Sequence, residues 1–285
     1  MKLLLIGRNG QVGRALEACL APLGEVIAFD RQGLDLAKTD QIVSVVRDIK
    51  PAVIVNAAAY TAVDQAETEP VVANAINAQG PAILAEEAKK LGALLVHYST
   101  DYVFDGTKAT PYVEDDTPNP LSVYGRSKLA GELAIQAASG RHIILRTSWV
   151  YGAEGRNFLL TMLRLARQKD ELRVVDDQIG APTSNELIAR TTAAILASNA
   201  DLHGLYHLCA AGQTSWAGFA KMIIAQAGLQ TRVVPISSAE YPVAAKRPLN
   251  SRLATTRLTA ATGIAVPDWK EDAIHILAKA VKAAS

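Results

Sequence analysis

The chain has 285 residues, with 29 lysine and arginine residues against 28 acidic residues and a formal net charge of +1. This length accommodates one large domain or two modest ones. With 49% hydrophobic residues, the chain can bury a core without metal or disulfide support. The neutral balance argues against a nucleic-acid or membrane partner, since such proteins usually carry a strong positive field. The uncharged stretch at residues 70–85 is too short and polar to span a bilayer.

The N-terminal segment and the cysteines indicate where the protein works. Only four apolar residues separate Lys2 from Gly7, whereas a signal peptide needs roughly 7–15, so a first strand is expected there. Cys19 and Cys209 lie in apolar segments without metal-ligand spacing. We expect buried thiols in a reducing compartment. These features predict a cytoplasmic protein.

Short β-branched or leucine-rich runs alternate with longer alanine-rich amphipathic stretches, as is typical of βαβ units and a parallel sheet. The pattern predicts strands at residues 2–6, 25–30, 52–56, 93–99, 143–147, 173–175 and 205–209. It predicts helices at residues 12–21, 40–50, 71–91, 122–138, 158–168, 185–198 and 216–228, and a last helix from residue 269. The runs at 52–56 and 93–99 are almost continuously apolar, as strands buried on both faces should be. We expect an α/β fold with a doubly wound, Rossmann-type parallel sheet.

A glycine-rich turn follows the first predicted strand. Gly7, Gly10 and Gly13 have GxxGxxG spacing and open the next helix. The pyrophosphate of a dinucleotide needs exposed backbone N–H groups, the positive end of a helix dipole and no obstructing side chains. The spacing is one residue longer than the GxGxxG fingerprint, and a plain strand–helix turn would also use glycines. Its position directly after strand one favours a dinucleotide site.

The residues after the second strand bear on which dinucleotide binds. Asp30 can accept both ribose hydroxyls of NAD and repel a 2′-phosphate. Arg31 and Arg8 nevertheless lie close enough in sequence to receive that phosphate. Asp35 and Leu36 could flank the adenine or form a surface turn. The sequence therefore leaves NADH and NADPH both open.

Small residues after the third predicted strand bear on the cofactor site, and a change in the sequence pattern near residue 200 bears on the domain boundaries. Ala57, Ala58 and Ala59 follow the third predicted strand and would leave room for a cofactor, although ordinary helix–sheet packing also favours alanine. We expect residues 1–170 to form the NAD(P)-binding domain, continuing in parts of 171–210. The regular alternation fades after about residue 200. We therefore expect residues 171–285 to form mainly a smaller, interleaved α/β substrate-binding lobe.

The fourth predicted strand leads to Thr100, and the next helix carries the YxxxK pair Tyr124 and Lys128. Residues four apart share one helix face, so the ammonium could sit beside the phenol. Lowering the phenol pKa from about 10 to about 7 requires roughly 4 kcal/mol, which this lysine and a positively charged nicotinamide could supply. The pattern predicts a general acid–base at Tyr124. Chance alone gives about 0.4 such pairs in a chain of this composition, so the argument depends on the glycine turn upstream.

Seven segments carry a resemblance: GRNGQVG (7–13), NAAAYTAVD (56–64), STDYVFDG (99–106), YGRSK (124–128), RTSWVYG (146–152), DQIGAPT (177–183) and RPLNSRL (247–253). With these motifs, essentially the whole chain resembles the extended short-chain dehydrogenase/reductases. It is most similar to the branch that completes dTDP-L-rhamnose synthesis by reducing a nucleotide-linked 4-keto-6-deoxysugar. The resemblance implies that NADPH or NADH supplies the hydride, and it is the only basis for thymine as the base.

The resemblance also implies residue roles. Tyr124 would protonate the C4 oxygen, Lys128 would hold the nicotinamide ribose and tune Tyr124, and Thr100 would position the carbonyl. The cofactor would contact Gly7, Gly10, Gln11, Val12, Gly13, Asp30, Arg31, Asp35, Leu36, Ala57, Ala58, Ala59, Tyr60, Thr61, Tyr98, Tyr124 and Lys128. The sugar nucleotide would contact Thr100, Asp101, Val103, Phe104, Trp149, Arg247 and Asn250, the last two near its phosphates.

One departure from the family concerns metal. Some members bind Mg²⁺ through acidic residues, including one at the extreme C-terminus, and dimerise around it. Glu186 stands where one ligand would be, but no carboxylate side chain follows Asp272. The sequence argues against a magnesium-bridged dimer and leaves a monomer or another homodimer. His203 and His207 are four apart, but no third ligand is near in sequence.

Two alternatives keep the same scaffold. An epimerase or dehydratase acting on a nucleotide sugar would reuse the Tyr124–Lys128 pair and return the hydride, so that no cofactor would be consumed. A non-catalytic regulatory homologue is also possible in this family, although the intact Thr100, Tyr124 and Lys128 argue against it. Trp216 and Trp269 lie at helix positions and are expected to pack in the core rather than stack on a ligand.

Overall fold

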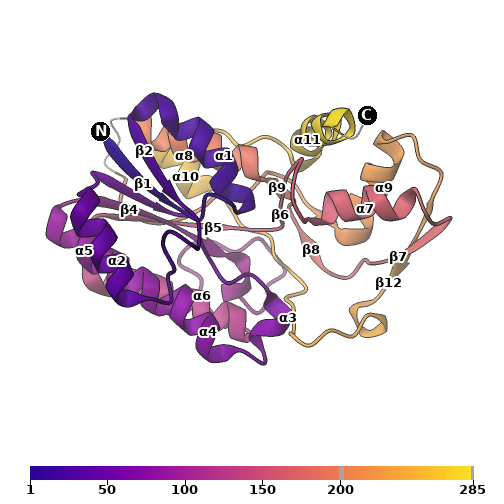
Figure 1. Cartoon of the computed structure of the whole chain (residues 1–285). Coiled ribbons are helices and arrows are strands. Elements are labelled where there is room, and N and C mark those ends of the chain that lie inside the picture. Colours follow the sequence, from indigo (N-terminus) through magenta and orange to yellow (C-terminus); the bar gives the residue numbers. More distant parts are fainter. Residues whose placement is uncertain (199–201, 284–285) are drawn as a thin grey trace.

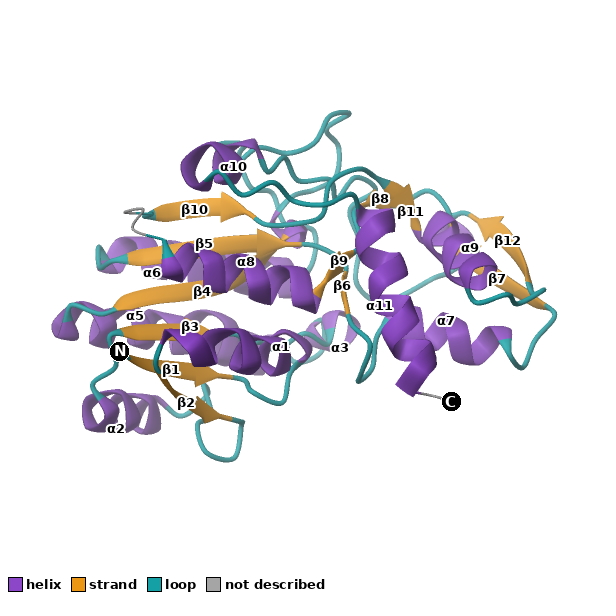
Figure 2. Cartoon of the chain, turned by 90° about the horizontal axis from the view of Figure 1, so that it is seen from above, coloured by secondary structure: helices purple, strands orange, loops and turns teal. Residues whose placement is uncertain are grey.

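The structure is a computed structural model that describes residues 1–198 and 202–283. Its centre is a six-stranded parallel sheet with the order β10-β5-β4-β3-β1-β2 (Figures 1 and 2). The strands are β1 (Lys2–Ile6), β2 (Glu25–Phe29), β3 (Val53–Asn56), β4 (Leu94–Thr100), β5 (His142–Thr147) and β10 (Gly204–His207). The strand order reverses between β1 and β3, which is where ligands bind in doubly wound sheets. The predicted fold class is confirmed.

Helices cover both faces of this sheet (Figure 1). One face carries α1 (Gln11–Leu20), α8 (Asn185–Ala197) and α10 (Thr256–Thr262), and the other carries α2 (Thr39–Ile49), α5 (Gly80–Leu91) and α6 (Val123–Ala138). Alternate residues of β1 enter the two cores: Leu3 and Leu5 pack on the first side, and Leu4 and Ile6 on the second. Each such buried side chain contributes about 1.5–3 kcal/mol. This packing holds the carboxyl edge of the sheet rigid.

The single helix expected at residues 71–91 is divided. It consists of α4 (Pro70–Asn74), a π-helical turn (Ala75–Gln79) and α5. The wider turn carries the buried Asn77, whose side chain accepts a hydrogen bond from the Tyr60 backbone N–H and donates to Ser127 Oγ. The backbone there lies so close to α6 that a Cβ on Gly131 would be 2.1 Å from Asn77 O. Such π-turns occur often at functional sites.

After β5 the chain builds a second lobe beyond the carboxyl ends of the strands (Figure 2). Its helices are α7 (Phe158–Ala166), α9 (Trp216–Gln226) and α11 (Trp269–Ala283). Three two-stranded sheets pair β6 (Val150–Tyr151) with β9 (Thr183–Ser184), β7 (Glu171–Val175) with β12 (Arg232–Ile236), and β8 (Ile179–Gly180) with β11 (Thr214–Ser215). The strand expected at 173–175 therefore belongs to a small sheet of the lobe, because its partner β12 lies there.

Shorter elements complete the described chain: α3 (Val63–Ala66) and the 3₁₀ turns Ala21–Leu23, Asp101–Val103 and Ser238–Glu240. Between visits to the lobe the chain returns to the central sheet through α8 and β10, so the two parts are interleaved. The domain boundary near residue 170 stays a prediction. Within the described residues, each helix is too short or too polar to cross a bilayer.

Candidate active site

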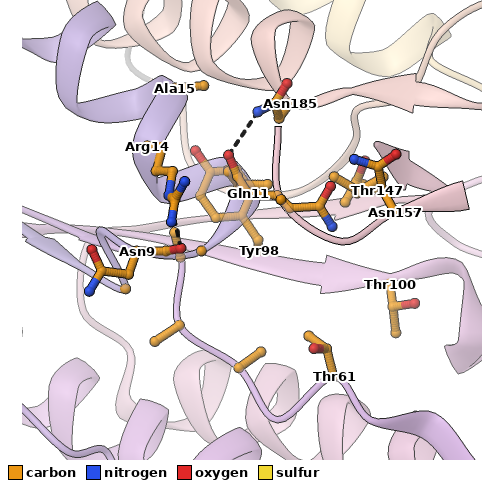
Figure 3. A pocket seen from close by; sticks show the side chains of 18 of the residues that line it. Asn9, Gln11, Arg14, Ala15, Thr61, Tyr98, Thr100, Thr147, Asn157 and Asn185 are labelled. Atoms are coloured by element: carbon orange, nitrogen blue, oxygen red, sulfur yellow. Dashed lines mark hydrogen bonds between the residues drawn. The ribbon is translucent and has the colours of Figure 1, made fainter. Parts of the chain in front are cut away.

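A cleft of about 1730 Å³ opens at the carboxyl edge of the sheet and reaches the lobe (Figure 3). It gathers residues from the glycine turn, from the ends of several central strands, from α6 and from the segment after β5. Nineteen of the residues expected at the site line it: Gly7, Gly10, Gln11, Val12, Asp30, Arg31, Asp35, Leu36, Ala57, Ala58, Ala59, Tyr60, Thr61, Tyr98, Thr100, Asp101, Tyr124, Lys128 and Trp149. The residues expected to bind the cofactor and those expected to act on the substrate therefore line one cavity.

The glycine turn is built so closely that side chains cannot enter it. Gly7 has a φ of +91°, and a Cβ there would lie 2.7 Å from Ala58 N at the end of β3. A Cβ on Gly13 would lie 2.0 Å from Gly7 O. Gly13 itself does not line the cleft, so it supports the turn from behind. The first N–H groups of α1, which no intrahelical carbonyl satisfies, are left at the cleft for an anion.

Five buried oxygen atoms on the cleft wall have no hydrogen-bond partner among the described residues. They are Gln11 Oε1, Ser99 Oγ, Asp101 Oδ2, Thr147 Oγ1 and Asn185 Oδ1. Buried polar atoms are normally satisfied, so a cluster of orphaned acceptors and hydroxyls indicates where a polar ligand makes hydrogen bonds. The amide of Asn185 is fixed by its bond to Gln11 O at 2.9 Å (Figure 3).

Asp30 lines the cleft just after β2, and its carboxylate is held by hydrogen bonds from nearby residues. Its Oδ1 accepts the backbone N–H groups of Gln32 at 3.0 Å and Gly33 at 3.1 Å, and Oδ2 accepts from Asn9 Nδ2 at 3.0 Å. Oδ2 therefore retains room for a ribose hydroxyl. The Arg31 side chain is 75% exposed and can turn toward a phosphate. The geometry is compatible with either cofactor.

Tyr124 projects from the first turn of α6. Ser122 starts this helix by accepting the Gly125 N–H at 3.1 Å, and the Tyr124 ring lies edge-on to Tyr102 with centroids 5.8 Å apart. Burial raises the pKa of Tyr124 to about 12, although a hydrogen bond with Thr100 opposes the rise. The phenol therefore stays protonated throughout the neutral range.

Asp101 follows Thr100 at the end of β4 and is 3% exposed. Its Oδ1 accepts the Thr100 hydroxyl at 3.0 Å. Burial raises the pKa of Asp101 to about 6, against hydrogen bonds from Ser251 and Thr100 that lower it. Asp101 lines the cleft beside Thr100, and its Oδ2 has no hydrogen-bond partner among the described residues.

Lys128 lies one turn after Tyr124 and also lines the cleft, but its hydrogen bonds run to β4. Its Nζ donates to Tyr98 O at 2.6 Å and lies 3.1 Å from His97 Nε2. Burial lowers the pKa of Lys128 to about 8. The expected lowering of the Tyr124 pKa is not seen in this structure, because burial dominates it and the lysine is directed elsewhere.

The model of one family, described as RmlD substrate binding domain, matches residues 1–282. The chain belongs to the RmlD substrate binding domain family. The dTDP-4-dehydrorhamnose reductase of Burkholderia thailandensis is 47% identical over 95% of this chain and 96% of its own. That of Escherichia coli K12 is 44% identical over 95% of both chains. The Bacillus anthracis dTDP-4-dehydrorhamnose reductase, solved with NADP, is 37% identical with a TM-score of 0.94, covering 98% of this chain and 99% of that one.

Four residues expected at the substrate lie outside the cleft lining of this RmlD-family chain: Val103, Phe104, Arg247 and Asn250. Val103 and Phe104 are at most 1% exposed in a separate small core. Asn250 Nδ2 donates to the backbone carbonyls of Lys108 and Thr110, and Arg247 donates to Asp64 Oδ2 at 2.7 Å. These side chains are engaged in holding loops together.

The lobe contributes cleft residues that sequence reasoning did not assign to the site. Trp216 stacks on Trp149 with centroids 3.6 Å apart and planes 7° apart, and both line the cleft. Trp149 has a φ of +48°, a strained conformation of the kind that clusters at ligand sites. Asn157 of the lobe and Asn185 at the start of α8 also line the cleft (Figure 3). Their positions depend on tertiary contacts that no local sequence motif predicts.

Glu186, the possible magnesium ligand, lines the cleft but is occupied by a cation of the chain itself. Lys279 Nζ donates to both of its carboxylate oxygens, at 2.8 and 2.6 Å, and His275 Nε2 lies 3.6 Å away. Within residues 1–198 and 202–283, no cluster of three potential metal ligands is found. An ammonium paired with the carboxylate does not fit a divalent cation at this position.

Proposed function

We propose that this chain reduces the C4 ketone of dTDP-4-dehydro-L-rhamnose to dTDP-L-rhamnose, a precursor of cell-surface polysaccharide, with NADPH or NADH as the reductant. One observation carries the proposal: the glycine turn and the Thr100–Tyr124 pair line the same cleft. Its support comes from relatives named dTDP-4-dehydrorhamnose reductase that are 44–48% identical over almost the whole chain.

The residues present fit a dinucleotide. Gly7 and Gly13 keep the turn free of Cβ atoms. Gln11, whose buried Oε1 has no partner among the described residues, lines the same cleft. Gly10 and the start of α1 would hold the pyrophosphate, and Ala57 to Thr61 would flank the cofactor as it crosses the sheet edge. When bound, the cofactor supplies a hydride to the C4 carbon.

The chain's own residues supply the proton. As C4 is reduced, the O–H bond of Tyr124 breaks and its proton moves to the C4 oxygen. The Thr100 hydroxyl would turn from Asp101 Oδ1 to donate its hydrogen bond to the same oxygen. Because the pKa of Tyr124 is raised to about 12, the phenol begins each cycle protonated, as a general acid must. Asp101 would accept a sugar hydroxyl, and Trp149 would pack against the sugar nucleotide.

We also propose that the protein acts in the cytoplasm, as a monomer or as a homodimer without a bridging metal. Both cysteines are free thiols, which suits a reducing compartment. The Lys279–Glu186 ion pair supports the absence of a metal bridge. Light scattering with and without a chelator measures the mass; a chelator-dependent dimer would contradict this proposal.

The direct test incubates the purified chain with dTDP-4-dehydro-L-rhamnose and either NADPH or NADH. The expected result is the loss of one equivalent of reduced nicotinamide for each dTDP-L-rhamnose formed. An epimerase or dehydratase would change the sugar without net consumption of cofactor, and a regulatory homologue would do neither. Either of these outcomes would contradict the proposal.

A further inference from the structure

Two tryptophans from distant parts of the chain meet on the lobe side of the cleft, and the proposed reaction gives a role to only one of them. Trp149 lies between β5 and β6, and Trp216 is the first residue of α9. Their rings are stacked with centroids 3.6 Å apart and planes 7° apart, and both line the cleft. Aromatic pairs generally prefer offset or edge-to-face contacts with centroids about 4.5–7 Å apart. The surrounding residues must therefore hold these two rings in place.

The backbone of the lobe holds Trp149. Its φ of +48° is one that residues with a side chain rarely adopt. A Cβ on Gly180 would lie 2.5 Å from Cε2 of the indole and 2.8 Å from its Nε1, so one edge of the ring rests on the glycine backbone. The Trp149 carbonyl accepts the Thr183 N–H at 3.3 Å. Both the backbone of Trp149 and one edge of its ring are thus fixed.

A series of hydrogen bonds holds Trp216. An indole N–H can only donate, and Trp216 Nε1 donates to Gln178 Oε1 at 3.2 Å. This contact orients the amide so that its NH₂ group donates to Ser238 Oγ at 2.9 Å. The Ser238 hydroxyl donates in turn to Asp177 Oδ1. Because Gln178 is only 8% exposed, water has little access to the bond that fixes the indole.

Packing also connects Trp216 to the core of the lobe. Phe158, the first residue of α7, lies against Trp216 with ring centroids 4.7 Å apart and planes tilted by 49°. Phe158 stacks in turn on Phe219, with centroids 5.5 Å apart, and Phe219 is fully buried in the core that α7, α9 and α11 form. Trp216 therefore supports Trp149 from a rigid part of the molecule.

The strand register places Trp149 close to the residues proposed to act on C4. Thr147 ends β5, and its Cα partner in the ladder is Thr100 at the end of β4. Trp149 follows Thr147 by two residues and so leaves the sheet at the same edge. The sugar ring, whose C4 oxygen Thr100 would hold, is therefore the part of the substrate expected beside this indole.

We propose that Trp216 and Gln178 are positioning residues that fix the Trp149 indole as a rigid apolar surface for the sugar of the substrate. This inference rests on the proposed function, because Trp149 meets a sugar only if a sugar nucleotide binds. A 6-deoxysugar has a methyl group and ring C–H bonds that an aromatic face can cover. An unsupported indole would have to be ordered when the sugar binds, so fixing it in advance should strengthen sugar binding by ~5–10-fold.

The first test reads the ring pair without any ligand. The chain has three tryptophans, so ¹H–¹⁵N spectra of the tryptophan-labelled full-length protein contain three indole N–H signals. Trp149→Phe, Trp216→Phe and Trp269→Phe assign them. Gln178→Leu, which removes the acceptor of Trp216, should shift the Trp149 signal as the stacked ring moves and should leave the Trp269 signal unchanged. A Trp149 signal that does not respond to Gln178→Leu would overturn the proposal.

The second test measures the affinities of dTDP-L-rhamnose and dTDP by calorimetry, with NADPH present so that no reaction can occur. Trp216→Ala should weaken dTDP-L-rhamnose binding by ~5–10-fold and dTDP binding by less than ~2-fold. Trp216→Phe, which keeps an aromatic ring, should restore most of the affinity. Trp269→Phe is the matched control, because that ring packs edge-on against Phe219 outside the cleft lining. Both affinities should be unchanged in the control.

A double-substitution cycle separates positioning from general damage to the lobe. In a chain that already carries Trp149→Ala, adding Trp216→Ala should not weaken dTDP-L-rhamnose binding further, because Trp216 acts through that indole. Additive losses, or equal losses for dTDP and dTDP-L-rhamnose, would overturn the proposal. An unaltered chain that binds neither nucleotide would contradict the proposed function as well, whereas sugar-nucleotide binding that does not depend on Trp216 would overturn this inference alone.

Discussion

The glycine-turn end of the cleft and the Tyr124 end recognise their ligands by different means. At the first, the binding groups are backbone N–H groups, and the sequence contributes mainly by omitting side chains, as at Gly7 and Gly13. At the second, the binding groups are buried side chains, and burial shifts the pKa values of Asp101, Tyr124 and Lys128 away from those in water. The first end costs little stability, whereas the second holds polar groups whose desolvation the rest of the fold must offset.

The largest effect is expected at the Tyr124 end of the cleft, from the substitution Tyr124→Phe. The ring would keep its contact with Tyr102, but the proton donor would be lost, so kcat should fall by ~10²–10⁴-fold. NADPH affinity should be unchanged, because the glycine turn is untouched. Steady-state kinetics and a fluorescence titration measure the two quantities.

A matched control for that variant is Tyr206→Phe. Tyr206 is also buried, on β10, and its hydroxyl donates to His203 O at 3.3 Å outside the cleft lining. The kcat of the Tyr206→Phe variant should equal that of the unaltered protein. If Tyr124→Phe turned over as fast as Tyr206→Phe, the assigned proton donor would be wrong.

Asp101→Asn tests whether the buried groups at the Tyr124 end of the cleft lower the free energy of unfolding. The pKa of Asp101 is raised to about 6 in the folded chain and is about 3.9 when unfolded, so folding loses stability as pH rises from 4 to 6. The cost above pH 6 is about 3 kcal/mol. The asparagine variant should be more stable at pH 7, with the difference narrowing toward pH 4. Urea unfolding at both pH values measures it, and an asparagine variant no more stable at pH 7 would contradict the account.

Gly13→Ala tests whether the glycine-turn end of the cleft binds the cofactor. A Cβ at this position would lie 2.0 Å from Gly7 O, so the turn must shift, which should cost about 2 kcal/mol of stability and weaken cofactor binding. Gly140→Ala is the control, because its nearest neighbour is a side-chain atom, Lys89 Cβ, at 3.1 Å. Equal NADPH affinities in the two variants would show that the turn does not cradle the cofactor.

The smallest effect is expected from Arg31→Ala. The guanidinium is largely exposed and only weakly paired with Asp35, at 3.5 Å, so its attraction for a 2′-phosphate is worth up to about 1 kcal/mol. NADPH affinity should fall by ~5-fold and NADH affinity should stay the same. Equal losses for both cofactors would place Arg31 away from the phosphate.

The same contrast explains what could be predicted from the sequence. The glycine spacing, the buried strands and the YxxxK pair are local patterns that directly encode backbone geometry or one helix face. Asn56, His97 and Trp216 carry no such signal, because their contacts join β3, β4 and α6 or lie within the second lobe. The sequence does not show which sheet the strand at 173–175 joins, because its pairing partner, β12, follows some 60 residues later.

The position of Lys128 shows why sequence spacing alone did not predict the pKa of Tyr124. Its place four residues after Tyr124 correctly predicts that both side chains reach one cleft. Which atom the Nζ contacts depends instead on the depth of burial and on the carbonyl of Tyr98. Arg247 and Asn250 show the same limit: their motif is recognisable, but their side chains bind Asp64 and a neighbouring loop.

Transfer of isotope from the cofactor tests the central claim most directly. The chain would be given dTDP-4-dehydro-L-rhamnose and NADPH carrying deuterium at the transferable position, and the product would be analysed by mass spectrometry and NMR. The account predicts one deuterium at C4 of each dTDP-L-rhamnose, with one NADPH oxidised. A converted sugar that contains no deuterium, with the NADPH left intact, would contradict it.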